Sequence, residues 1–139
     1  MGYKKVFIDS DIFLDVLLTR EPFLKSAQVL LGLGSEKPKE LCTSSLIMAN
    51  VHYMVTKTFS KTIAKQQVTV LAQIITVLPF DEQDIVSALK TEHIDFEDTV
   101  QYQIAKKTEC DLIISRNIKH YKKFDIPVLT AEQFLRTIL

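Results

Sequence analysis

The sequence has few cysteines, no net charge and no long apolar run. Its 139 residues include two cysteines, Cys42 and Cys110, which form no CxxC pair. Their separation predicts free thiols in a reducing compartment. The 17 basic and 17 acidic residues cancel, so any nucleic-acid binding must come from a local patch. No segment is long enough to span a bilayer and the start lacks the apolar run of a signal peptide, which together predict a cytoplasmic protein with no membrane partner.

The rest of the composition is typical of one globular domain. A chain of 139 residues, 47% of them hydrophobic, is long enough to bury a core and too apolar to be disordered. The chain contains no repeat, linker or low-complexity segment. We therefore expect residues 1–139 to form a single domain.

Short apolar segments alternate with helical patterns along the chain. Strands are expected at 5–8, 111–115 and 127–129, a short apolar segment at 41–43, and an edge segment at 77–80, which contains Pro79. Helices are expected over 12–18, 23–33, 46–58, 62–75, 82–90, 96–107 and 131–139. Strands separated by helices predict an α/β fold, a three-layer α/β/α sandwich around a mostly parallel central sheet.

The first strand runs directly into acidic residues. Asp9 and Asp11 lie on either side of its carboxyl end, where open α/β sheets bind ligands. Carboxylates at this position suit Mg²⁺ or Mn²⁺, which prefer hard oxygen ligands. The alternative is that Asp11 or Ser10 caps a helix beginning near Ile12, a role that does not require Asp9.

A second acidic group, Asp95, Glu97 and Asp98, opens the helix expected over 96–107. Negative charge is favourable at a helix N-terminus. Asp95 is therefore expected to be the N-cap, and the alternative role for Asp98 is the third position of a capping box. A third polar group, Ser115 with Asn117, follows the strand expected over 111–115.

Four segments in this order resemble the PIN domain, in its VapC-type toxin form. They are the strand with Asp9-Ser10-Asp11, the segment Ser44-Ser45-Leu46-Ile47-Met48-Ala49-Asn50, the segment Asp95-Phe96-Glu97-Asp98 with Ala105 behind it, and Asp111-Leu112-Ile113-Ile114-Ser115-Arg116-Asn117. The resemblance covers nearly the whole chain. It implies a metal-dependent endoribonuclease, the toxin of a toxin–antitoxin pair, with RNA as substrate and an antitoxin protein as partner. It also implies acidic groups that hold Mg²⁺ or Mn²⁺ at the edge of the sheet.

Carried over to this chain, the resemblance makes Asp9 and Asp98 metal ligands and catalytic residues. Asn50 stands where the pattern usually has a glutamate, Asn117 where an aspartate is more usual, and His120 where a further acid often follows. The amide oxygens of Asn50 and Asn117 can support a metal or its water but bring no charge. Asp11, at a position that is often Asn in the family, restores one charge as a third metal ligand. Ser115 is expected to orient the site.

A basic run follows the same strand. Arg116, Lys119, His120, Lys122 and Lys123 are candidates for a clamp on RNA phosphates, with Tyr121 as a surface on which a base could stack. The alternative is a solvated loop. A separate excess of apolar residues suggests a homodimer surface or a groove for an antitoxin peptide; these are Phe13, Leu17, Leu18, Phe23, Leu30 and Leu33.

Two other functions compete with the nuclease. A PIN-like module with amides in place of acids could bind RNA or a protein without cleavage. A haloacid-dehalogenase-like phosphatase would use Asp9 as nucleophile and Asp11 as general acid. Against the phosphatase, Phe13 stands where that family has a small hydroxyl residue, and the chain is short for such an enzyme.

Overall fold

The computed structural model describes residues 2–35, 40–92 and 95–138. These residues form a five-stranded sheet in the order β3-β2-β1-β4-β5, in which every paired strand is parallel. The strands are β1 (Lys5–Ile8), β2 (Glu40–Ser44), β3 (Thr76–Leu78), β4 (Leu112–Ile114) and β5 (Val128–Leu129). The predicted α/β class and parallel sheet are confirmed. The edge position expected for segment 77–80 is confirmed too, because β3 ends the sheet.

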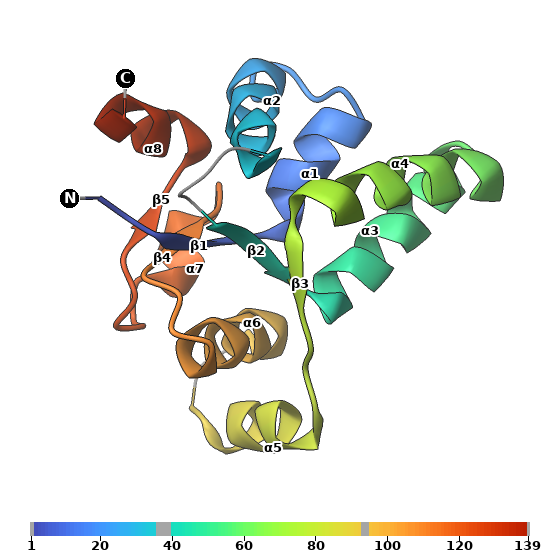
Figure 1. The fold of residues 1–139 in the computed structure, drawn as a ribbon. Coiled ribbons are helices and arrows are strands. Elements are labelled where there is room, and N and C mark those ends of the chain that lie inside the picture. The colour runs from blue at the N-terminus through green and yellow to red at the C-terminus, as the bar shows by residue number, and fades with distance from the viewer. Residues whose placement is uncertain (1, 36–39, 93–94, 139) are drawn as a thin grey trace.

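Helices connect the strands and cover both faces of the sheet. They are α1 (Ser10–Leu17), α2 (Leu24–Gly32), α3 (Ser45–Thr58), α4 (Lys61–Ile74), α5 (Glu82–Lys90), α6 (Phe96–Lys107), α7 (Ile118–Tyr121) and α8 (Ala131–Ile138), with a 3₁₀ turn at Leu33–Ser35. Figure 1 shows α1 and α2 on one face and α5 and α6 on the other, which completes the three layers. None of the helices among the described residues is long and apolar enough to cross a membrane.

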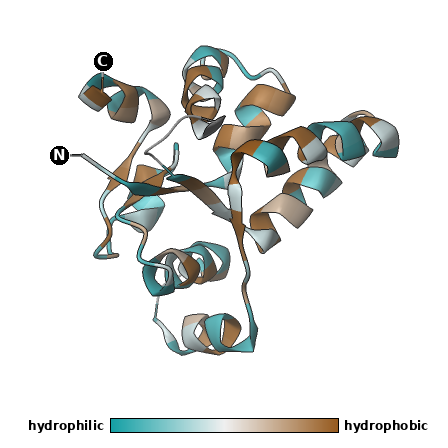
Figure 2. Cartoon of the chain, in the orientation of Figure 1, coloured by the Kyte–Doolittle hydropathy of each residue, from teal (hydrophilic) through white to brown (hydrophobic). Residues whose placement is uncertain are grey.

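The core lies along the two central strands. Each residue of Leu112–Ile114 is fully buried, as are Val6, Phe7 and Ile8, because a parallel strand covered by helices on both faces has no solvent side. In Figure 2 these strands are brown, while teal predominates on the outer sides of the helices. Phe13 and Leu30 are fully buried in this core, so they are not the surplus surface residues that the sequence suggested.

Several expected boundaries were wrong by one or two residues because the capping residue lay elsewhere. The first helix begins at Ser10 rather than residue 12, since Asp9 is its N-cap. Likewise, Ser60 caps α4 with its hydroxyl, which accepts the Ile63 N–H at 3.1 Å. Helix α7 was not predicted at all, because the basic run was expected to be a loop.

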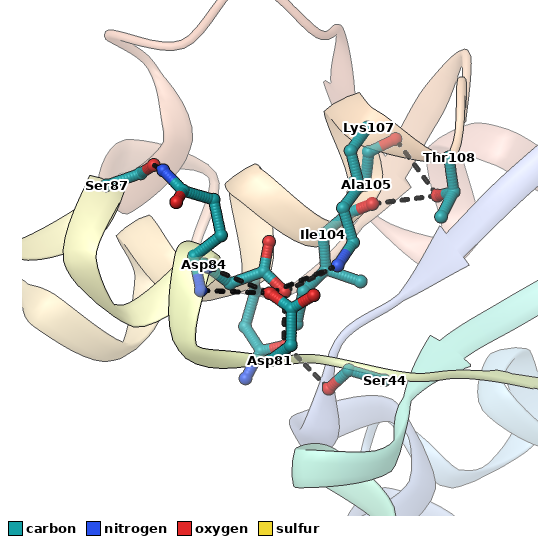
Figure 3. A network of polar contacts seen from close by, with 10 residues as sticks. Ser44, Asp81, Asp84, Ser87, Ile104, Ala105, Lys107 and Thr108 are labelled. Carbon is teal, nitrogen blue, oxygen red and sulfur yellow. Dashed lines mark hydrogen bonds and ion pairs between the residues drawn. The ribbon is translucent and has the colours of Figure 1, made fainter.

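Side-chain contacts fix α6 against its neighbours. The pair Asp81 and Asp84 forms a capping box at the start of α5. Lys107 of α6 donates to buried Asp84 at 2.6 Å and lies 4.0 Å from Asp81, as Figure 3 shows. On the sheet side, the Ser44 hydroxyl donates to Gln101 Oε1 at 2.7 Å. These bonds hold α6, and with it Asp98, at the carboxyl edge of the sheet.

Candidate metal-binding site at the carboxyl edge of the sheet

The candidate site lies where the strand order reverses. From β1 the chain proceeds to β2 on one side, and returns later to β4 on the other side. Helices therefore diverge at the carboxyl ends of β1 and β4, which is where open α/β sheets form their ligand crevice. Ile8 pairs with Ile114, and the Asp9 N–H donates to the Ile114 carbonyl at 2.9 Å. This register places Asp9 beside Ser115.

Asp9 has two roles in the structure. Its Oδ1 accepts the Ser10 N–H at 2.8 Å, so Asp9 is the N-cap that was expected at Asp11 or Ser10. Such a cap is worth about 1 kcal/mol. Its Oδ2 accepts the Ser115 hydroxyl at 2.9 Å. The residue is only 7% exposed, and burial raises the pKa of its carboxyl, while the hydrogen bonds from Ser10 and Ser115 act in the opposite direction.

Asp11 lies two residues further, in the first turn of α1, and is also buried. Its Oδ2 accepts the Arg116 N–H at 3.0 Å and is approached at 3.4 Å by the Ser115 hydroxyl and the Asn117 amide. Its Oδ1 is buried and accepts no hydrogen bond within the described part of the chain. Burial and the charge of Asp9 raise the pKa of Asp11 to about 7. Asp11 is thus a buried carboxylate with hydrogen-bond donors from the described residues at only one of its two oxygens.

Ser115 links the parts of the site. It is fully buried, donates to Asp9 and accepts the Asn117 N–H at 2.9 Å. A single hydroxyl therefore fixes one carboxylate and the loop that follows β4. The expectation that Ser115 orients the site agrees with these contacts.

Asp98 reaches the site from the first turn of α6. Asp95 is the N-cap, as predicted, and accepts the Asp98 N–H at 2.9 Å. The Asp98 carboxylate does not complete a capping box; its Oδ2 lies 3.0 Å from His120 Nδ1, a contact that becomes an ion pair when the imidazole is protonated. Burial, then the charges of Asp95 and Asp9, raise the pKa of Asp98 to about 6, against the opposing effect of His120.

Tyr121 is part of the site, although the sequence suggested a base-stacking role for it. That suggestion was wrong, because the residue is fully buried and offers no face to RNA. Its hydroxyl makes no hydrogen bond of good geometry with the described residues. Burial and the adjacent charge of Asp9 raise the pKa of Tyr121 well above its usual value. The sequence did not indicate this inward position, because the lysines on either side of Tyr121 are typical of an exposed segment.

Asp15 is a second residue that sequence reasoning missed. It is 1% exposed, and Arg116 binds both of its oxygens, with Nε and Nη2 at 2.9 and 3.0 Å. The Arg116 guanidinium also lies 4.0 Å from the centre of the Phe23 ring. The available signal was the spacing of Asp11 and Asp15, four residues apart and so on one helix face. The guanidinium of Arg116, which was expected from the sequence to bind RNA, forms this ion pair in the structure.

The remaining predicted residues lie at the surface. Lys119, His120, Lys122 and Lys123 are exposed on α7 and just after it, and His120 lies against Asp98. Asn50 is exposed on α3, and no hydrogen bond between described residues joins it to the acidic site. Asn117, in contrast, is brought to Asp11.

The residues present fit a divalent cation. Asp9 and Asp11 lie at the start of α1 and Asp98 lies at the start of α6. Burial raises the pKa of each carboxyl, and the charge of Asp9 adds to this for Asp11 and Asp98. Asp11 Oδ1 and Asp98 Oδ2 are buried without a hydrogen bond from the described residues. A cation would relieve both penalties, and oxygen ligands suit Mg²⁺ or Mn²⁺. The fold and site define a parallel α/β protein with carboxylates gathered at its switch point, where they could hold a cation.

Comparison with known proteins gives the family. A family model described as "PIN domain" matches residues 5–119. Ribonuclease VapC1 of Aquifex aeolicus (strain VF5) is 31% identical over 139 residues, covering 96% of this chain and 95% of the relative. The chain belongs to the PIN domain family, as the resemblance indicated.

Solved structures share the fold at lower identity. VapBC-1 from nontypeable Haemophilus influenzae superposes with a TM-score of 0.71 at 15% identity, over 92% of this chain and 98% of that one. A toxin-antitoxin complex from Klebsiella pneumoniae gives a TM-score of 0.66 at 18% identity, over 91% and 97%. At these identities the match concerns the fold alone.

Proposed function

We propose that the protein is a metal-dependent endoribonuclease that hydrolyses RNA phosphodiester bonds and acts as the toxin of a toxin–antitoxin pair. The observation that carries the proposal is the placement of three carboxylates at this edge: Asp9 and Asp11 are buried, Asp98 is partly buried, and the charge of Asp9 raises the pKa of the other two. Membership of the PIN family and similarity to a protein named Ribonuclease VapC1 support RNA as the substrate. Membership of the PIN domain family also argues against the alternative of a haloacid-dehalogenase-like phosphatase.

In this proposal Asp9, Asp98 and Asp11 hold Mg²⁺ or Mn²⁺. The bound ion supplies Lewis-acid chemistry, activating a water for in-line attack on a phosphodiester and stabilising the leaving oxygen. Ser115 fixes the Asp9 carboxylate through its 2.9 Å hydrogen bond. Asn117, whose amide approaches Asp11 at 3.4 Å, orients that carboxylate or a water on the ion. Asn50 is assigned the same supporting role from α3.

RNA would reach the site over α7. Lys119, Lys122 and Lys123 are exposed on or just after α7, the helix that brings His120 to Asp98. They can therefore neutralise phosphates that flank the scissile bond, although the chain has no net positive charge. Each phosphate contact that is lost should weaken binding and lower its salt dependence.

The test is cleavage of varied RNAs by the purified protein in Mn²⁺, in Mg²⁺ and in EDTA. Metal-dependent cleavage that disappears in the double variant Asp9→Asn, Asp98→Asn would support the nuclease. An Asp125→Asn variant is the matched control, since Asp125 is an exposed acid that contacts Lys106 and Tyr102 away from the site. RNA binding without cleavage in every metal would favour the second candidate, a binding module, which the amides at Asn50 and Asn117 favour.

The partners follow from the same proposal. The structural neighbours described as VapBC and toxin-antitoxin complexes support an antitoxin partner. Exposed Tyr53, Phe59 and Val70, on or beside α3 and α4, support a homodimer, which light scattering would detect. We also propose that residues 1–139 act as one domain in the cytoplasm, where the two thiols, Cys42 and Cys110, are free and buried.

A further inference from the structure

A histidine lies against the acids at the start of α6, one of which belongs to the candidate site. Asp95, Asp98 and His120 each offer one ligand atom, and these atoms all lie within 4.8 Å of one another. We propose that His120 supplies a nitrogen ligand to the ion, so that the site selects a transition-metal divalent cation such as Mn²⁺ or Co²⁺ over Mg²⁺. This inference rests on the proposed metal site and concerns what the chain's own residues make it bind.

The position of His120 is fixed by the structure around it. Helix α7 follows β4 directly, and the His120 N–H donates to the Asn117 carbonyl at 3.0 Å. The next residue, Tyr121, is fully buried, so it anchors the helix and leaves His120 at the rim. There His120 Nδ1 lies 3.0 Å from Asp98 Oδ2. Two ligand atoms at this separation can both bind one ion.

A buried hydroxyl lies beside the same groups. Tyr121 has no exposed surface, and its hydroxyl lies against the carboxylate of Asp9 and near that of Asp98. Asp98 Oδ2 is itself buried and accepts no hydrogen bond from the described residues, although buried polar atoms nearly always have a partner. An ion held by Asp98 and His120 would supply that partner.

The donor chemistry decides which ion fits. Mg²⁺ demands hard oxygen ligands in near-ideal octahedral geometry. Imidazole is a ligand for first-row transition ions, and the affinity of a site with nitrogen and oxygen donors rises from Mn²⁺ through Co²⁺. The chain also has amides at Asn50 and Asn117, which bring no charge to the site. Fewer charges and one nitrogen together weaken the site for Mg²⁺ more than for Mn²⁺ or Co²⁺. The alternative is a plain ion pair between His120 and Asp98, with no role in metal binding.

Spectroscopy of the bound ion separates these two cases. Tag-free protein loaded with Mn²⁺ would be examined by pulsed electron paramagnetic resonance for coupling to ¹⁴N. We expect nitrogen coupling in the wild type, its loss in His120→Gln, and its retention in His52→Gln. His52 is a partly exposed histidine on α3, so it is the matched control. Circular dichroism would check that each variant is folded.

Calorimetry gives the selectivity. The ratio of Mn²⁺ to Mg²⁺ affinity should fall about tenfold or more in His120→Asp, which replaces the nitrogen by a hard carboxylate. Mn²⁺ binding without nitrogen coupling in the wild type, or an unchanged ratio in His120→Asp, would overturn this inference and leave the nuclease proposal intact. Failure of every divalent ion to bind would overturn both.

Discussion

The substitution Asp11→Asn should stabilise the metal-free protein. Asp11 is 9% exposed, one of its oxygens accepts no hydrogen bond among the described residues, and it lies beside Asp9. An asparagine of the same shape keeps an oxygen for the Arg116 N–H and removes the buried charge. The variant therefore trades a functional group for stability, as is common where a site is electrostatically strained.

The magnitude follows from the pKa. Asp11 has a pKa of about 7 against an ordinary value of 3.8, so the unfolded chain releases a proton that the folded protein retains. The stability that the folded state has at low pH is therefore lost progressively as pH rises from about 4 to about 7, and the loss is complete above that. At about 1.36 kcal/mol per pH unit, the full difference is about 4 kcal/mol. Because Asn is an imperfect replacement, we expect Asp11→Asn to raise the free energy of unfolding by about 2–4 kcal/mol at pH 8. At pH 5 this increase should be about half as large.

The assay is urea denaturation of wild type and variant in EDTA at pH 8 and pH 5. The control is Asp84→Asn, at an acid that is as buried but paired with Lys107 at 2.6 Å; this variant should lose stability at both pH values. With Mn²⁺ added, the wild type should gain more stability than Asp11→Asn. A loss of stability in Asp11→Asn at pH 8 in EDTA, or a gain that does not depend on pH, would refute the reasoning.

Three further predictions concern the same edge of the sheet. Arg116→Met should lower the free energy of unfolding by about 3 kcal/mol, because it leaves the Asp15 carboxylate buried without the two hydrogen bonds from the guanidinium. In urea denaturation, the double variant Arg116→Met, Asp15→Leu should recover part of the lost stability. Strictly additive effects of the two substitutions would contradict this prediction. Mn²⁺ affinity measured by calorimetry should fall as pH drops through about 7 and about 6, where Asp11 and Asp98 take up protons; a flat profile from pH 8 to 5.5 would count against a site built on these carboxylates. Mn²⁺ at a hundred times its Kd should raise the unfolding free energy by about 2.7 kcal/mol, reversibly with EDTA, and an unchanged melting temperature would contradict specific binding to the folded state.

The sequence was sufficient for the fold and for the position of the first carboxylate. Continuous apolar runs at Val6–Ile8 and Leu112–Ile114 predicted strands buried on both faces, and the structure confirms them. Parallel strands separated by helices then brought Asp9 and Ser115 to one edge. These features depend on local pattern and on general rules of topology, which one sequence carries.

The inward-facing side chains could not be predicted in the same way. Tyr121 stands among lysines, so its local pattern is that of a surface loop, yet it is fully buried. In the sequence, Asp15 has the pattern of an ordinary exposed acid on a helix. In the structure it is paired with Arg116, which lies 101 positions later in the chain. Similarly, Asp9 proved to be both cap and candidate ligand. Each of these facts depends on contacts between distant segments, and propensity carries no information about them.

The pairing of β1 with β4 has a consequence for when the site comes into existence. Asp9 meets its Ser115 partner across 106 positions of chain, and chains emerge from the ribosome N-terminal end first. The Asp9 carboxylate is therefore made early and stays without its hydroxyl partner and without α7 until residues 115–121 have been released. This edge of the sheet is thus completed only after segments that are distant in the sequence have both been synthesised.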